Sequence, residues 1–246
     1  MSSGGLPFVE LPAPSGSPSA ALIFLHGSGG CPDDYPREVA AAIRATPSLA
    51  HVKCILPAAP RRVVQANMGM RMPAWFDIFT FDFPLEVPPA GNEDAEGIEA
   101  SIAALEGILE DVVASGIPAE RIVLGGISQG AAMALLTGLT TPKKLAGLVA
   151  LSSRLPLRYK LKSMASPHCS KLPIFWGHGQ VDPLVPHELG RVCAEFIVQE
   201  LGVPSAPYLG APEGLDFHSY PKLPHTICEE EVRDVARWLA QVIPAD

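Results

Sequence analysis

Short runs of aliphatic and β-branched residues alternate with longer amphipathic stretches along almost the whole chain. The apolar runs predict strands at 21–25, 52–56, 121–125, 147–151, 174–177 and 216–220. Apolar positions spaced close to 3.6 residues predict helices at 35–45, 94–115, 129–138, 188–201 and 229–242. Strands and helices in this alternation are typical of an α/β fold, with a mainly parallel sheet and helices on both faces.

One connection is far longer than the two to six residues that usually separate a strand from the next helix. It runs from Pro57 to Gly91 and contains three methionines, a tryptophan and four phenylalanines, interrupted by prolines. Methionine and aromatic side chains form an adaptable apolar surface, which suits a ligand with a flexible chain. The alternative is a β excursion whose aromatic side chains complete the core.

Composition narrows the class of protein. A chain of 246 residues with 48% hydrophobic residues can bury a large core, and we expect one domain over residues 1–246. The net charge of −8 argues against nucleic acid as a partner. The longest apolar runs are too short to cross a membrane, so we expect no stable membrane insertion.

The cysteines and the N-terminal segment indicate the cellular setting. Five cysteines are scattered without C-x-x-C spacing, which predicts neither a disulfide framework nor a zinc site, and the chain suggests no metal and no cofactor. Residues 1–18 lack the basic start and apolar stretch of a signal peptide and are expected to be flexible or extended. A cytoplasmic location fits best.

Ser128 is the candidate nucleophile. It is the centre of a G-x-S-x-G pentapeptide, residues 126–130, between a predicted strand and a predicted helix. A serine at such a sharp turn takes a strained backbone conformation that exposes its hydroxyl, and the flanking glycines let the strand and the helix approach each other. The pattern alone also fits an ordinary turn, and the strand and helix around it favour the nucleophile.

A serine nucleophile needs a histidine base and a carboxylate that orients the base. In α/β-hydrolases these follow the serine in the order acid, then histidine. Asp182 lies in the loop after a predicted strand, although an aspartate before proline is also a common turn residue. His225 lies in the loop before the last helix and is preferred to His218, which falls inside a predicted strand.

Two backbone N–H groups are expected to form an oxyanion hole. The amide of Gln129 begins a helix, so it is free to bind an anion and is supported by the helix dipole. The second is assigned to Ser28, in the glycine-containing loop after the first buried strand. The three glutamates at 229–231 are interpreted as a solvated start of the last helix, favoured by its dipole.

With these residues assigned, the chain resembles the acyl-protein thioesterase, carboxylesterase and lysophospholipase family of small α/β-hydrolases. The resemblance spans nearly the whole chain and rests on ordered segments at 24–27, 67–78, 125–130, 151–157, 178–186 and 225–228. It implies a triad of Ser128, Asp182 and His225, an oxyanion hole from the amides of Ser28 and Gln129, and an acyl channel near Met72, Trp75 and Leu184. Two departures are Ser28, where the family usually has a bulkier apolar residue, and Arg154, a cation near the expected entrance.

The leading hypothesis is therefore a cytoplasmic serine hydrolase that cleaves thioesters or esters of acyl chains, as in protein depalmitoylation. Its partner would be an acylated protein. The first alternative is a carboxylesterase or lysophospholipase that acts on small esters or lysolipids. An alternative of another class is a ligand-binding receptor built on the hydrolase fold, since a fold does not determine a function.

Overall fold

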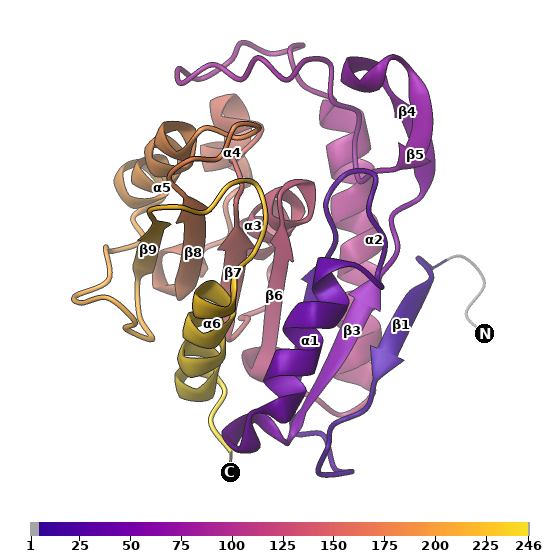
Figure 1. Cartoon of the computed structure of the whole chain (residues 1–246), viewed down its shortest axis with the longest axis vertical. Coiled ribbons are helices and arrows are strands. Elements are labelled where there is room, and N and C mark those ends of the chain that lie inside the picture. Colours follow the sequence, from indigo (N-terminus) through magenta and orange to yellow (C-terminus); the bar gives the residue numbers. More distant parts are fainter. Residues whose placement is uncertain (1–4, 246) are drawn as a thin grey trace.

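A sheet of seven strands lies at the centre of the computed structural model, which describes residues 5–245. The strands follow the order β1-β3-β2-β6-β7-β8-β9 (Figure 1). They are β1 (Phe8–Leu11), β2 (Ala20–Leu25), β3 (Val52–Pro57), β6 (Ile122–Ile127), β7 (Gly147–Leu151), β8 (Ile174–Gly179) and β9 (Leu215–Tyr220). Strands β2, β3 and β6 to β9 pair in parallel, and β1 pairs antiparallel with β3. The mainly parallel sheet is as predicted.

Helices pack on both faces of the sheet, as the alternating pattern predicts. They are α1 (Tyr35–Ala45), α2 (Ala95–Ala114), α3 (Gln129–Thr140), α4 (Arg158–Met164), α5 (His187–Leu201) and α6 (Glu229–Val242). Helices α1 and α6 cover one face, in front in Figure 1, and their apolar side chains share one core cluster. Helices α2, α3 and α5 contribute to the cluster on the other face. No helix within residues 5–245 is long and apolar enough to span a lipid bilayer.

The central strands read as uninterrupted apolar runs because both of their faces are buried. In β2, Ala21, Ile23 and Leu25 point into the core on the α2 and α3 side. The alternate residues Leu22 and Phe24 point into the core under α1 and α6. Successive side chains of a strand point to opposite faces, so an alternating polar pattern would have placed polar side chains beneath the helices on one face of this sheet.

Predicted and observed elements agree closely at the centre of the sheet. The strand at Gly147–Leu151 and the helices at Tyr35–Ala45 and Glu229–Val242 have the predicted bounds. The other predicted elements differ from the observed ones by one or two residues at their ends, with β6 and β8 each extending two residues further than expected. These extra residues carry β6 to the residue before Ser128.

Two elements were not predicted, and one residue was assigned wrongly. Residues 1–18 were expected to be flexible or extended; residues 1–4 lie outside the part of the chain that the structure describes, and residues 8–11 form β1, an extended edge strand whose Leu11 pairs with Cys54 of β3. Its half-exposed residues give no strong apolar signal. The short helix α4 was not predicted. Glu231, expected to be solvated, is fully buried in the first turn of α6.

The long connection contains a β excursion, and two of its aromatic residues, Trp75 and Phe76, join the buried core. Its first half is an antiparallel hairpin of β4 (Arg61–Val64) and β5 (Met70–Pro73), seen above the end of the main sheet in Figure 1. The carboxyl ends of the parallel strands meet at this same end, where ligands of open α/β sheets bind. The excursion therefore lies over the edge at which a functional site is expected.

Candidate active site

Ser128 lies in the sharp turn between β6 and α3. Its backbone has φ 55° and ψ −121°, a conformation that L-residues rarely adopt. The two flanking glycines make the turn possible. A Cβ on Gly126 would lie 2.5 Å from the carbonyl carbon of Gly130, and a Cβ on Gly130 would lie 2.4 Å from the carbonyl oxygen of Leu25. The G-x-S-x-G pattern thus has a steric cause, because Gly126 lies against the first turn of α3 and Gly130 lies against the end of β2.

The structure brings Ser128, His225 and Asp182 together. Nε2 of His225 lies 2.9 Å from Oγ of Ser128, and Nδ1 of His225 lies 2.7 Å from Oδ2 of Asp182. An ionised carboxylate can only accept a hydrogen bond, so the imidazole donates from Nδ1 and leaves Nε2 free to accept the serine proton. This is the tautomer that a general base for Ser128 requires.

Asp182 is held as an anion in a buried position. Its side chain is inaccessible to solvent, and its Oδ1 accepts the backbone N–H groups of Leu184 and Val185, each at 2.9 Å. Burial alone would raise the pKa of this carboxyl. Interactions with His178 and His225 and the N–H of Val185 outweigh that effect and hold the pKa of Asp182 well below its usual range. The carboxylate is therefore ionised at neutral pH.

The rejected candidate His218 belongs to a separate buried group. Its Nε2 lies 2.6 Å from Oδ2 of Asp216, and its ring centroid lies 4.5 Å from that of Phe175, so it takes no part in the arrangement around Ser128. His178 is also buried and donates from Nε2 to the carbonyl of Val185 at 2.9 Å. Within residues 5–245, no cluster of three or more His, Cys, Asp or Glu side chains is placed to hold a metal ion.

The two proposed oxyanion donors lie beside Ser128. Gln129 is the first residue of α3, so its N–H has no acceptor inside the helix. The loop that carries Ser28 also approaches the serine closely, because a Cβ on Gly27 would lie 3.3 Å from Cβ of Ser128. Ser28 and Gln129 both border the cavity that opens at Ser128. Their amides remain a prediction for the oxyanion hole.

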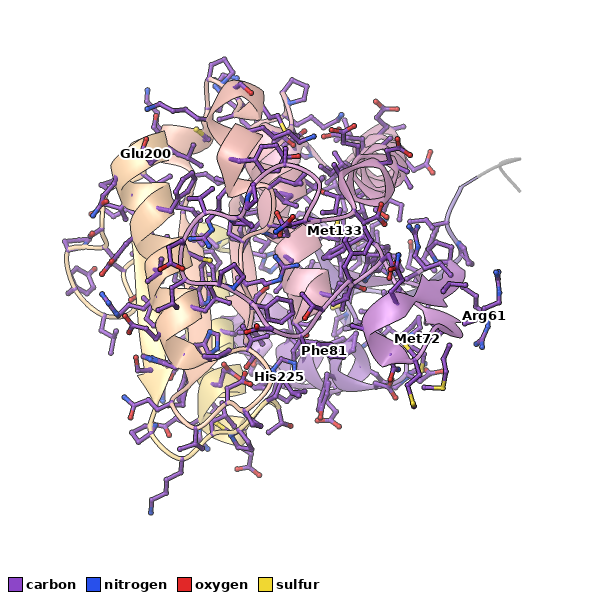
Figure 2. The ribbon with its side chains drawn as sticks, turned by 90° about the horizontal axis from the view of Figure 1, so that it is seen from above. Arg61, Met72, Phe81, Met133, Glu200 and His225 are labelled. Carbon is purple, nitrogen blue, oxygen red and sulfur yellow. The ribbon has the colours of Figure 1, made fainter. Side chains whose placement is uncertain are left out.

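A cavity of about 550 Å³ extends from Ser128 and His225. Much of its wall is apolar and comes from the long connection: Val64, Met72, Phe76, Ile78, Phe81 and Phe83. Met72, Phe81 and His225 all border it and can be located in the view from above (Figure 2). Asp34, Tyr35 and Glu38, at the start of α1, form a polar part of the rim. An apolar wall beside a nucleophile suits a hydrocarbon chain.

Of the three predicted acyl-contact residues, two border the cavity and one does not. Met72 and Leu184 border it, whereas Trp75 is fully buried and lies outside its lining. The indole N–H of Trp75 donates to the carbonyl of His26 at 2.8 Å, an interaction that the sequence gives no means to foresee. Phe81 and Phe83, noted only as members of an aromatic-rich segment, are part of the wall instead.

Arg154 also borders the cavity, as its position near the expected entrance suggested. Its guanidinium lies 4.5 Å from the ring centroid of Phe83 and pairs with the carboxylate of Glu93. The second oxygen of Glu93 accepts the N–H of Leu157 at 2.7 Å. The cation is therefore neutralised and stacked on an aromatic ring, so it completes the wall around Phe83.

A parallel sheet with a serine at a strained strand-to-helix turn, next to a histidine and an aspartate, defines the α/β-hydrolase class. The model of the phospholipase/carboxylesterase family matches residues 7–243, and the chain belongs to this family of hydrolases. It is 42% identical over 236 residues to acyl-protein thioesterase 1 of Mycosarcoma maydis, covering 93% of each chain. It is 40% identical over 233 residues to acyl-protein thioesterase 1 of Cryptococcus neoformans, covering 94% of this chain and 95% of the relative.

Solved structures show the same relationship. The crystal structure of Zea mays acyl-protein thioesterase 2 superposes with a TM-score of 0.75 at 26% identity, covering 96% of this chain and 99% of that one. The agreement extends over nearly the full length of both chains.

Proposed function

We propose that this protein is a serine hydrolase that cleaves thioesters or esters of acyl chains, with protein depalmitoylation as its principal reaction. The observation that carries the proposal is the hydrogen-bonded series from Ser128 through His225 to Asp182, whose Ser128 and His225 line a largely apolar cavity. The thioesterase relatives support the choice of thioesters and of acylated proteins as partners.

Each residue of the triad has one role. Oγ of Ser128 attacks the acyl carbonyl carbon while Nε2 of His225 accepts its proton, and the amides of Ser28 and Gln129 bind the resulting oxyanion. The tetrahedral intermediate collapses, the bond to the leaving sulfur or oxygen breaks, and His225 returns the proton to the leaving group. Water activated by His225 then attacks the acyl-enzyme and releases the fatty acid and Ser128.

A fluorophosphonate probe tests the nucleophile directly. The wild type should be labelled and hydrolyse p-nitrophenyl esters, whereas Ser128→Ala should be unlabelled and lose at least about 10³-fold in kcat. Because His225 must be neutral to accept a proton, kcat/KM should also fall on the acid side. An unlabelled wild type would favour a ligand-binding receptor on the same fold, and a rate that stays flat from acid to neutral pH would exclude His225 as the base.

The size of the acyl cavity gives a test between a thioesterase for long acyl chains and a carboxylesterase or lysophospholipase for small esters or lysolipids. A cavity of about 550 Å³ is in the range of pockets that enclose a whole small ligand. We therefore expect kcat/KM to rise from acetyl to octanoyl p-nitrophenyl esters and a palmitoylated peptide to be deacylated. Preference for acetyl over octanoyl esters, without action on the peptide, would favour a carboxylesterase or lysophospholipase for small esters or lysolipids.

A cytoplasmic location is part of the same proposal. The five cysteines are all free thiols, and this is the usual state in a reducing compartment. Fractionation of cells that express the tagged full chain tests it, and recovery in a secreted fraction would contradict it.

A further inference from the structure

We infer that the segment from Pro73 to Phe76 is a positioning device that holds both oxyanion donors, through the side chain of Gln129 and the indole of Trp75. The inference rests on the proposed function, since it takes the amides of Ser28 and Gln129 as the oxyanion hole. It assigns new roles to a side-chain amide and to an indole that do not touch the reacting atoms.

The side chain of Gln129 forms one half of the device. Gln129 is 5% exposed, and its Oε1 accepts the backbone N–H of Trp75 at 2.9 Å. Its Nε2 donates to the carbonyl of Phe76 at 2.7 Å. A peptide N–H can only donate and a carbonyl can only accept, so these two bonds determine which way the amide points. The first residue of α3 is thereby tied to the excursion by two directional bonds.

The loop that carries Ser28 is tied to the same segment on both sides of that residue. The N–H of Gly29 donates to the carbonyl of Pro73 at 2.7 Å. The indole N–H of Trp75 donates to the carbonyl of His26 at 2.8 Å. Ser28 therefore lies between two anchored neighbours.

His26 adds a third anchor to this loop. Its Nε2 accepts the N–H of Ala59 at 3.0 Å, so the proton is on Nδ1, which donates to the carbonyl of Gly27 at 2.7 Å. Burial lowers the pKa of His26, which keeps this imidazole neutral and preserves the tautomer.

Shared support matters because an oxyanion hole accelerates a reaction only when its donors are already in place. The two donors come from positions 28 and 129, and four hydrogen bonds connect their surroundings to Pro73, Trp75 and Phe76 of one short segment. The same segment continues into Ile78, Phe81 and Phe83 of the acyl wall. The device therefore predicts that loosening this segment weakens catalysis for every acyl length, including chains too short to reach the wall.

Two variants test the device from its two sides. Gln129→Met removes both side-chain bonds at similar volume, and Trp75→Phe removes the indole N–H and keeps an aromatic ring. Because losing a whole donor costs about 10² to 10³ in rate, a displaced donor should lower kcat by about 10 to 100-fold. We expect this loss for acetyl and octanoyl esters alike, with KM within about twofold of the wild type.

A second readout is independent of turnover. An alkylboronic acid forms a tetrahedral adduct on the serine, and one of its hydroxyl groups occupies the position of the oxyanion. Its affinity should fall by about the same factor as kcat/KM in both variants. Unchanged boronate affinity together with unchanged kcat would overturn the inference.

Trp238→Phe is the matched control. The indole N–H of Trp238, on α6, donates to the carbonyl of Ala211 at 3.0 Å, and Trp238 is fully buried in the core cluster under α1 and α6, on the other face of the sheet. This variant should lower thermal stability and leave kcat within about twofold. The inference would also be overturned if Trp238→Phe lowered kcat as much as the other two, or if those two raised only the KM of long esters.

The outcome is separable from that of the proposed function. If the wild type reacts with the fluorophosphonate probe but Gln129→Met and Trp75→Phe keep the wild-type kcat, only the positioning role is contradicted. If the wild type is not labelled, the proposed function itself is contradicted.

Discussion

Replacing Glu231 with glutamine should stabilise the protein, and increasingly so as the pH rises. Glu231 is fully buried in the first turn of α6 and has no side-chain partner within the described residues. Its Oε1 reaches β8, where a Cβ on Gly177 would lie 2.3 Å away. Burial, followed by the charge of Asp234, raises the pKa of this carboxyl from 4.5 to about 8.

The sign and size of the effect follow from proton linkage. Between pH 4.5 and 8 the unfolded chain has released the Glu231 proton that the folded protein still holds, so the free energy of unfolding falls as the pH rises. One pKa unit corresponds to about 1.36 kcal/mol, and the whole window therefore costs on the order of 4 kcal/mol. Glutamine stays neutral in both states and removes this loss.

Urea denaturation of wild type and Glu231→Gln at pH 4.5, 6 and 8 measures the effect. The difference in the free energy of unfolding should be small at pH 4.5 and reach several kcal/mol at pH 8. Glu229→Gln, in the same helical turn, is the control, because the Glu229 side chain is 95% exposed and its charge should matter by well under 1 kcal/mol. A difference in the free energy of unfolding between wild type and Glu231→Gln that stays the same at all three pH values would refute the reasoning.

Three further predictions concern the site. Asp182→Asn should lower kcat by about 10³ to 10⁴-fold with the fold intact, because asparagine cannot hold the required tautomer of His225; ester hydrolysis measures it, and a loss below tenfold would contradict this role. Arg154→Met should destabilise the protein by about 3 kcal/mol in urea denaturation, because the Glu93 carboxylate, 7% exposed, loses its counter-charge. Adding Glu93→Gln to this variant should recover much of the loss. Equal stability of the single and the double variant would argue against the Arg154–Glu93 pair. Gly130→Ala should abolish activity by displacing the turn at Ser128, and an active Gly130→Ala enzyme would show that the turn tolerates a Cβ. By contrast, Gly107→Ala on α2, where a Cβ meets nothing within 4 Å, should add about 1 kcal/mol of stability.

The elements that the sequence predicts best are those whose signal is local. The apolar run of β7 is buried on both faces, and the amphipathic face of α1 packs on the sheet, so pattern and burial coincide. Strand β1 behaves differently, since its alternating half-exposed residues become a strand only by pairing with β3, more than forty positions away. No local pattern reports such a pairing.

The same distinction separates the residues around Ser128. The strained turn can be predicted from residues 126–130 because part of its steric cause is local: a Cβ on Gly126 would meet Gly130. The other part is not local, since a Cβ on Gly130 would meet Leu25 of β2. Asp182, by contrast, is one aspartate before a proline among other turn residues. What makes it the partner of His225 is a 2.7 Å contact with a side chain 43 positions later, together with two backbone N–H groups that the loop directs at its other oxygen.

Trp75 and Glu231 were the residues interpreted least accurately. Trp75 was assigned to the acyl channel from the family resemblance, and Glu231 was assigned to solvent because it lies in the first turn of a helix. Both are instead fully buried next to elements that carry the site, Trp75 against the loop of Ser28 and Glu231 against β8, which leads to Asp182. A buried polar atom lowers the stability of the fold unless it forms a hydrogen bond.

The indole N–H of Trp75 forms such a bond, to the carbonyl of His26. The Glu231 carboxyl has no side-chain partner within the described residues, and its raised pKa keeps it neutral. Of the two, the indole is therefore the one whose removal should affect the chemistry, and the carboxyl the one whose replacement should affect only stability.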